Sequence, residues 1–357
     1  MMKIRIKKNL INLEPYLPDA VDFAVRLNAN ESPYNNDKFL LEKISNSKYS
    51  KFLNKNSLNR YPDPTYQTLI NKIAQNHNVK ENQIILSNGS DELISYLLTC
   101  LSGKTNSVLT FNPTFSMYEI LSKVFNVNCY KISLDKNFDI PISKTISSIK
   151  KNDPDIIFIA SPNNPSGNDF SKEKIREIID ISNGLVVIDE AYSDYSNNSF
   201  VPFVKKFKNL AVMKTMSKIG FASLRVGYLI SNKEIINALN KVKLPYNVST
   251  LSTIIAQDFF DNKKKYIKNI EEIKNQRDYL FKNLLKINKI KPYPSNSNFI
   301  FIYSQYAAKL SRYMESNKIK IKTFNSKKLK NYFRVTIGEA KENQKFLKFL
   351  YKFFENN

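Results

Sequence analysis

Short apolar runs alternate with amphipathic stretches through the first two thirds of the chain. The runs that we interpret as strands lie at residues 83–86, 107–111, 155–160, 185–188, 210–213 and 224–230. Between them, apolar residues recur at helical spacing, and we expect helices at 65–76, 93–101, up to about 125, and from 171 onward. Continuous apolar strands that alternate with helices are typical of a mostly parallel sheet with both faces covered. We therefore expect an α/β fold with a large, mostly parallel sheet.

The pattern changes after Pro245. Residues 250–287 keep helical periodicity without proline or glycine, which predicts one long connecting helix. The short apolar runs beyond it, which predict strands separated and followed by helices, lie at 298–303, 319–323 and 332–337. Pro15, Pro18 and Pro33 interrupt the first 38 residues, which we expect to be irregular and to pack with this second part. The expected organisation is an N-terminal segment (1–38), a large domain (39–250), and an interdomain helix with a smaller α+β domain (251–357).

Composition narrows the class of protein. Among 357 residues, 42% are hydrophobic, but no apolar run reaches the ~18 residues of a membrane-spanning helix. The N-terminus lacks the apolar core of a signal peptide. Only Cys100 and Cys129 are present, without CxxC spacing, so we expect no disulfide and no cysteine metal site. These features predict a reduced, cytoplasmic protein.

The formal net charge of +23 raises the alternative of a polyanion-binding protein. The lysines are scattered, however, and no basic track with interleaved aromatic residues stands out. We therefore favour a general compositional bias and expect neither nucleic acid nor membrane as a partner. The single histidine, His77, rules out a histidine-rich metal cage and leaves little room for a Ser-His-Asp triad, so we expect no metal. His77 lies near the end of a predicted helix, where a structural or solvated role is expected.

The segment 214–228, KTMSKIGFASLRVGY, holds two of the seven glycines. Its Lys218 could form a Schiff base with an aldehyde. Thr215, Ser217 and Arg225 could hold a phosphate ester. Pyridoxal phosphate carries both an aldehyde and a phosphate, which makes it the candidate cofactor. The alternative is a basic turn between two strands.

Further polar candidates follow the ends of predicted strands, where doubly wound sheets bind ligands. Gly89 and Ser90 open a helix whose N–H groups could receive a phosphate, or they form an ordinary helix start. Asp189 ends an apolar strand, and its partly buried carboxylate would need a cation or strong donors, such as a protonated pyridine nitrogen. Tyr192 and Asn164 could reach the phenolic oxygen of the same ring, although the turn around Asn164 is also a good turn sequence.

Two more positions have open interpretations. Phe115 could stack on a flat ring or fill the core at a helix start. Arg334 is either a surface residue on an edge strand or a bidentate anchor for a carboxylate. The glycines in or beside the candidate segments are Gly89, Gly167, Gly220, Gly227 and Gly338. Their concentration predicts special backbone geometry gathered at one site.

Seven motifs occur in one order along the chain. They are NRYPDP (59–64), SNGSDE (87–92), NPTFSMY (112–118), SPNNPSG (161–167), VIDEAY (187–192), SKIGFASLRVGY (217–228) and FRVTIG (333–338). Together they resemble the histidinol-phosphate aminotransferase branch of the fold type I pyridoxal-phosphate enzymes. The resemblance runs from about residue 9 to the C-terminus.

The resemblance implies pyridoxal phosphate as cofactor and a role for each matching residue. Lys218 would hold the cofactor and carry a proton, Asp189 would face the pyridine nitrogen, and Phe115 would stack on the ring. Asn164 and Tyr192 would donate to the ring oxygen. The implied phosphate cup comprises Gly89, Ser90, Thr215, Ser217 and Arg225.

The resemblance also implies a homodimer and a substrate site. Tyr61 would reach the phosphate of the cofactor bound to the neighbouring subunit, and Arg334 would bind the α-carboxylate of a substrate. The segment 26–34, RLNANESPY, would close over the substrate and contribute Asn30. Where the family has an arginine for the distal phosphate, this sequence has Lys322, which lacks the fork geometry.

These implications predict an aminotransferase with ping-pong kinetics. It would move an amino group between an amino acid such as glutamate and a phosphorylated ketone or amine, resembling histidinol phosphate or smaller. One alternative is a decarboxylase of a phosphorylated amino acid, similar to threonine-phosphate decarboxylase. The alternative from another class is the polyanion-binding protein.

Overall fold

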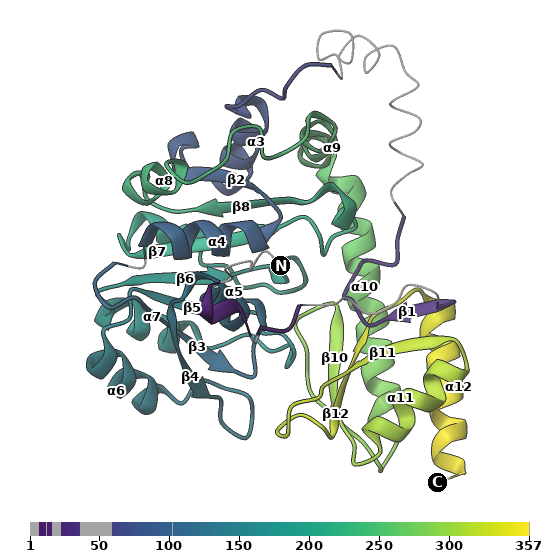
Figure 1. Ribbon diagram of the computed structural model, residues 1–357. Coiled ribbons are helices and arrows are strands. Elements are labelled where there is room, and N and C mark those ends of the chain that lie inside the picture. Colours follow the sequence, from purple (N-terminus) through teal and green to yellow (C-terminus); the bar gives the residue numbers. More distant parts are fainter. Residues whose placement is uncertain (1–6, 12, 16–22, 36–58, 102, 357) are drawn as a thin grey trace, which may run out of the picture.

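The computed structural model describes residues 7–11, 13–15, 23–35, 59–101 and 103–356. The boundary expected between residues 38 and 39 lies outside the described residues. Within them the chain builds two sheets of different size, each packed with helices (Figure 1).

The large sheet has the order β2-β8-β7-β6-β5-β3-β4. Its strands are β2 (Ile84–Asn88), β3 (Ser107–Asn112), β4 (Asn128–Ser133), β5 (Ile156–Ala160), β6 (Leu185–Asp189), β7 (Leu210–Thr215) and β8 (Val226–Ile230). Strand β8 runs antiparallel to both of its neighbours, and the other pairs are parallel. This sheet confirms the expected α/β fold.

Helices cover both faces of the large sheet. One face carries α4 (Ser90–Leu101), α5 (Met117–Phe125) and α8 (Lys233–Asn240), and the other carries α3 (Gln67–His77), α6 (Ile142–Asn152), α7 (Lys172–Ile181) and α9 (Thr250–Asp261). Alternate residues of one strand enter the two cores, so Val187 packs on the first side and Val186 and Ile188 on the second. Burial on both sides explains why these strands are continuously apolar.

The small sheet has the order β1-β11-β12-β10-β9. Its strands are β1 (Val25–Leu27), β9 (Lys291–Pro292), β10 (Phe299–Tyr303), β11 (Ile319–Thr323) and β12 (Tyr332–Thr336). The helices α10 (Lys263–Leu284), α11 (Ala307–Ser316) and α12 (Ala340–Glu355) pack on one face through a shared apolar core. The opposite face contacts the large-sheet side, where Phe138 packs against Phe301 and Tyr192 against Phe299.

Short 3-10 turns and caps mark the connections. The turns are η1 (Lys8–Leu10), η2 (Glu81–Gln83), η3 (Ser193–Tyr195), η4 (Val201–Lys205) and η5 (Ala222–Leu224). Helix α7 begins where the Ser171 hydroxyl accepts from the backbone N–H of Lys174, and α9 begins at Ser249 in the same way.

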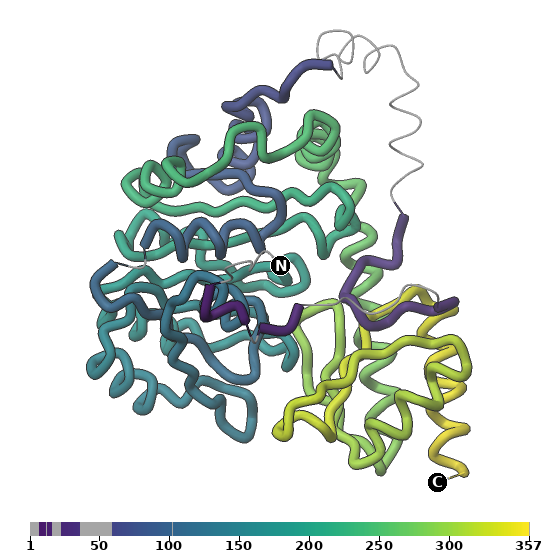
Figure 2. Tube along the Cα trace, viewed as in Figure 1, coloured from purple at the N-terminus to yellow at the C-terminus, as the bar shows by residue number. Residues whose placement is uncertain are grey.

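The N-terminal segment contacts both parts of the molecule, as the purple trace in Figure 2 shows. The Asn9 amide donates to the carbonyl oxygen of Lys123 on α5 at 2.7 Å. Farther along, β1 pairs in parallel with β11. The expectation of an entirely irregular segment is therefore wrong at η1 and β1, because three-residue elements are too short to show a period.

Two other expectations are wrong in detail. The single helix over 250–287 is two helices, α9 and α10, because Asn262 adopts φ −119° and ψ 28° and breaks the helical path. The strand expected from Leu224 begins at Val226, since Leu224 ends η5 and Arg225 has φ +53°. Neither interruption contains proline or glycine, the residues that mark a turn in a sequence, so neither could be expected from the sequence.

Candidate active site

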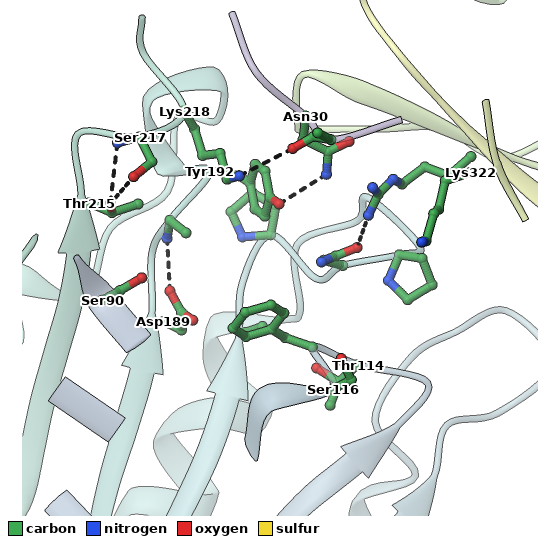
Figure 3. Close-up of a pocket in the computed structure, with 18 of the residues that line it drawn as sticks. Asn30, Ser90, Thr114, Ser116, Asp189, Tyr192, Thr215, Ser217, Lys218 and Lys322 are labelled. Carbon is green, nitrogen blue, oxygen red and sulfur yellow. Dashed lines mark hydrogen bonds between the residues drawn. The ribbon is translucent and has the colours of Figure 1, made fainter. Parts of the chain in front are cut away.

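A cavity of about 540 Å³ lies between the C-terminal ends of the large-sheet strands and the small sheet (Figure 3). It brings together most of the predicted site residues. Those that line it are Asn30, Ser90, Phe115, Asn164, Asp189, Tyr192, Thr215, Ser217, Lys218, Arg225, Lys322 and Arg334. Of the other two candidates, Gly89 lies next to this lining, and Tyr61 lies on the surface.

Lys218 follows β7 and faces the cavity between the N-terminal segment and Tyr192 (Figure 3). Its Nζ lies 3.4 Å from the carbonyl oxygen of Ala29 and 5.9 Å from the centre of the Tyr192 ring. Its amine is therefore positioned above an aromatic ring and beside backbone oxygen, open to a bound molecule.

The hydroxyls near Lys218 form a compact cluster. The Thr215 hydroxyl lies 3.0 Å from the Ser217 hydroxyl and accepts from the Ser217 backbone N–H at 3.2 Å. Arg225 Nη1 donates to the Ser217 hydroxyl at 3.4 Å. These donors gather beside Ser90, at the positive N-terminal end of α4, where an anion is stabilised.

Gly89 lets Arg225 lie against the turn before α4. Its φ is +78°, and a Cβ added there would lie 2.4 Å from Arg225 Nη2. A side chain would therefore displace the guanidinium and strain the turn. The predicted special geometry at this glycine is confirmed in this respect.

Asp189 ends β6 with its side chain buried, more completely than the sequence suggested. Its Oδ2 accepts from the Tyr118 hydroxyl at 2.7 Å, and its Oδ1 accepts from the Ala191 N–H at 3.0 Å. Burial raises the pKa of Asp189 to about 6, although both hydrogen bonds oppose this shift. Sequence reasoning missed Tyr118, whose place at the end of the NPTFSMY motif was the available signal.

Asn30 connects the N-terminal segment to both sheets. Its side-chain amide donates to the Tyr192 hydroxyl at 3.0 Å, and its Oδ1 accepts from the Thr336 hydroxyl at 3.0 Å. The Asn298 amide donates to the Asn30 carbonyl oxygen. Thr336 and Asn298 were missed because no local pattern reports contacts between residues some 300 positions apart, such as Asn30 and Thr336.

Arg334 is buried on β12, an interior strand, so the interpretation as a surface residue on an edge strand is wrong. Its Nη2 donates to the Asn28 carbonyl oxygen at 2.6 Å, and its Nη1 donates to Asn164 Oδ1. Lys322 lies directly opposite Arg334 in the β11–β12 register, and both line the cavity.

The remaining candidates have plain surroundings. Phe115 lines the cavity and packs edge-on against Tyr118, with the ring centres 5.6 Å apart. Tyr61 is 79% exposed and stacks on Tyr246. His77 Nε2 lies 2.9 Å from the Tyr228 hydroxyl, and burial with nearby lysines lowers its pKa to about 3, so of its two expected roles the structural one holds.

Among the described residues, no group of histidine, cysteine, aspartate or glutamate side chains could hold a metal ion. In the same part of the chain, no helix is long and apolar enough to cross a membrane.

Comparisons with known proteins agree with this geometry. The family model described as "Aminotransferase class I and II" matches residues 24–350. The histidinol-phosphate aminotransferase of Vesicomyosocius okutanii subsp. Calyptogena okutanii (strain HA) is 39% identical over 342 residues, which cover 95% of this chain and 94% of the relative. The crystal structure of the histidinol-phosphate aminotransferase from Clostridium acetobutylicum has a TM-score of 0.85 and 26% identity, covering 93% of this chain and 100% of that one.

Two more distant structures share the fold. The histidinol-phosphate aminotransferase from Sinorhizobium meliloti, in complex with pyridoxal-5'-phosphate, has a TM-score of 0.85 at 18% identity and covers 96% of each chain. The L-threonine-O-3-phosphate decarboxylase from Porphyromonas gingivalis has a TM-score of 0.78 at 21% identity, covering 93% of this chain and 99% of that one. The family match spans the strand ends and loops that line the cavity. The chain therefore belongs to the class I and II aminotransferase family, and it is a pyridoxal-phosphate-dependent aminotransferase of fold type I.

Proposed function

We propose that this aminotransferase moves an amino group between glutamate and a phosphorylated ketone or amine, with histidinol phosphate as the first candidate. The observation that carries the proposal is the pairing of Lys322 with Arg334 across β11 and β12 at one end of the cavity. Two cations on adjacent strands suit a substrate with two anionic or polar ends. The relatives named histidinol-phosphate aminotransferase support the same substrate class.

The residues of the cavity fit pyridoxal phosphate. Asp189 is a buried carboxyl whose two partners in the described chain, Tyr118 and Ala191, are both neutral donors. A protonated ring nitrogen would supply the cation that keeps this carboxylate ionised. The hydroxyls of Thr215 and Ser217, with Arg225 and the start of α4, offer donors for a phosphate. When bound, the cofactor supplies an aldehyde that condenses with amines and a ring that accepts electrons.

Lys218 is the residue that we assign to proton transfer. Its Nζ removes the proton from the substrate Cα and returns it in the reverse direction. Tyr192 lies under this amine, and the amide of Asn30 holds the Tyr192 hydroxyl in place. Asn30 thereby orients the proton-transfer site from the small-sheet side.

Arg334 and Lys322 are assigned to substrate binding. Asn28 and Asn164 hold the Arg334 guanidinium at the cavity, where it can bind the α-carboxylate of glutamate. Lys322 binds the distal phosphate of the second substrate as a single point charge. Phe115 would stack on the cofactor ring, and its contact with Tyr118 holds it at the cavity wall.

The test is a substrate panel. Purified protein with histidinol phosphate and 2-oxoglutarate is expected to form glutamate, and histidinol is expected to be a poorer donor because it cannot use Lys322. The rival function, decarboxylation of a phosphorylated amino acid, would release carbon dioxide from threonine phosphate. Equal rates for histidinol phosphate and histidinol, or carbon dioxide release without amino transfer, would contradict the proposal.

We further propose a homodimer in which Tyr61 reaches the phosphate of the cofactor bound to the neighbouring subunit. Its support is the exposed aromatic pair of Tyr61 and Tyr246, together with Leu244 and Leu251, which lie near Tyr246 in the sequence and are also exposed. Exposed apolar side chains of this kind suit an interface between subunits.

The two free cysteines, Cys100 and Cys129, support the proposed cytoplasmic location.

The domain organisation is a proposal as well. The large sheet supports a domain over 39–250, and the small sheet with α10, α11 and α12 supports a second domain over 251–357, in which α9 packs on the large sheet as the first part of the interdomain connection. The N-terminal segment up to residue 38 would contribute β1 to the smaller domain.

A further inference from the structure

We propose that Arg26 is a second phosphate-binding residue, acting with Lys322 on the distal phosphate of the substrate. The inference rests on the proposed function, because it assumes a phosphorylated substrate at this end of the cavity. It gives the first residue of the segment 26–34 a role of its own, and the Arg26 guanidinium would supply the fork geometry that Lys322 lacks.

The alternation of side chains places Arg26 on the correct face. Val25 and Leu27, its neighbours on β1, are buried in the apolar core beneath the helices, so Arg26 lies on the opposite face of the sheet. By the same alternation, Lys322 follows the buried Ile321, and Arg334 lies between the buried Phe333 and Val335. Arg26, Lys322 and Arg334 therefore share one sheet face, and all three line the cavity.

The strand register sets the reach between the cations. Arg26 lies opposite Lys320 in the parallel β1–β11 pair, so Lys322 is two residues farther along the neighbouring strand. Strand geometry then separates the two Cα atoms by roughly 8 Å. Two long side chains at that separation can contact different oxygens of one phosphate group.

The present partner of Arg26 is weakly held. Its Nη2 lies 3.7 Å from Glu31 Oε2, and both side chains are nearly half exposed. An exposed ion pair at this distance contributes little to the stability of the protein. A phosphate dianion can therefore replace the carboxylate as the partner of the guanidinium.

The neighbouring cation on the same face is committed elsewhere. Lys320 Nζ forms an ion pair with Glu315 at 2.7 Å and lies 5.2 Å from the Phe23 ring. Lys320 is also absent from the cavity lining. Lys320→Gln is therefore a matched control, because this substitution removes one positive charge from the same sheet face without changing the lining of the cavity.

The experiment compares steady-state kinetics of the holoenzyme and three variants with histidinol phosphate and with histidinol. Arg26→Gln is expected to raise KM for histidinol phosphate about tenfold, the effect of losing one charge-assisted hydrogen bond. KM values for histidinol and glutamate are expected to stay within about twofold, which also shows that the site remains assembled. Arg26→Lys is expected to recover part of the loss, and Lys320→Gln is expected to behave as the wild type.

The outcomes separate this inference from the proposed function. If the wild type prefers histidinol phosphate and Arg26→Gln keeps that preference, Arg26 is not a phosphate ligand, while the proposed function stands. An equal loss in Lys320→Gln would mean that only overall charge matters and would also overturn the assignment of Arg26. If the wild type shows no preference for the phosphorylated compound, both the inference and the proposed substrate class are wrong.

Discussion

Asp189 and Glu190 are consecutive buried carboxylates, and their surroundings differ. Glu190 accepts from Lys214 Nζ at 3.0 Å and from the Ser199 hydroxyl at 2.9 Å. Burial alone would lower the pKa of Lys214, but Glu190 and Asp194 more than offset it and raise that pKa. The negative charge of Glu190 is thus balanced by Lys214 within the protein. Among the described residues, the hydrogen-bond donors to Asp189 are both neutral. This contrast is the residue-scale reason for assigning Asp189 to a cationic ligand.

The first prediction concerns the pH dependence of stability without cofactor. Burial raises the pKa of Asp189 to about 6, so between pH 4 and 6 the folded protein holds a proton that the unfolded chain releases. Stability from this group is therefore present at low pH and falls as pH rises through 6, by about 3 kcal/mol in total. Asp189→Asn cannot titrate and is expected to remove this fall. Urea unfolding of both cofactor-free proteins from pH 4 to 7 measures the difference, and parallel profiles would contradict the assignment.

The second prediction concerns Lys218. The purified holoenzyme is expected to be yellow, and borohydride is expected to abolish the visible band and fix the cofactor on Lys218, as peptide mass spectrometry would show. Lys218→Ala is expected to reduce turnover by orders of magnitude, because it removes the amine assigned to proton transfer. Lys214→Arg serves as a control, since Lys214 is buried in an ion pair with Glu190 and does not line the cavity. Labelling at any other lysine would refute the assignment.

At the scale of elements, the site depends on the close approach of the turn before α4 to the start of β8. The turn from β2 into α4 and the start of β8 approach so closely that a Cβ on Gly227, in β8, would lie 2.6 Å from the backbone carbonyl carbon of Gly89. Strand β8 runs antiparallel between β2 and β7, which brings the turn after β2, the start of β8 and the end of β7 to the same end of the sheet. The N-terminal end of α4 and Arg225 therefore meet at the proposed phosphate site.

The third prediction tests this approach. Gly89→Ala is expected to weaken pyridoxal-phosphate binding at least tenfold, because the added methyl would displace Arg225 and the residue would be strained at φ +78°. Gly103→Ala is the matched control, since among the described residues, its chain neighbours aside, the added carbon would meet nothing nearer than 4.0 Å. Cofactor titration by absorbance measures both variants. Unchanged affinity in Gly89→Ala would show that the turn does not shape the phosphate site.

At the scale of the whole molecule, the cavity needs three separate parts of the chain. The large sheet supplies Lys218 and Asp189, the small sheet supplies Arg334, and the N-terminal segment supplies Asn30. Tyr61 lies apart from them on the exposed surface, stacked on Tyr246. A fourth contribution, from a second copy of the chain, would explain an aromatic pair left so open to solvent.

The fourth prediction tests that contribution. Lys218→Ala and Tyr61→Ala are expected to be poorly active alone, while mixed dimers regain about one intact site of two. Activity after mixing, unfolding and refolding the two variants together is the measurement, and each variant refolded alone is the control. Full activity of Tyr61→Ala by itself would contradict the shared site. So would a fully active wild-type protein that light scattering shows to be a monomer at the assay concentration.

The sequence by itself determined the large sheet and most of the candidate site. The apolar runs that became β5 and β6 are continuous because helices cover both faces, and polar motifs follow their ends. Lys218, Asp189 and Arg225 could be selected because each belongs to a short local motif. Local patterns carry this information because neighbouring residues in the chain share one turn or strand end.

Tertiary structure alone decided the contacts between distant residues. The bond from Tyr118 to Asp189, the connection of Asn30 to Thr336, and the cavity position of Arg26 join parts of the chain that share no local period. The interior position of β12, which buries Arg334, follows from the order of five strands and is invisible in one strand's sequence. Packing and register set these relations, because side chains from separate segments converge only after both sheets are assembled.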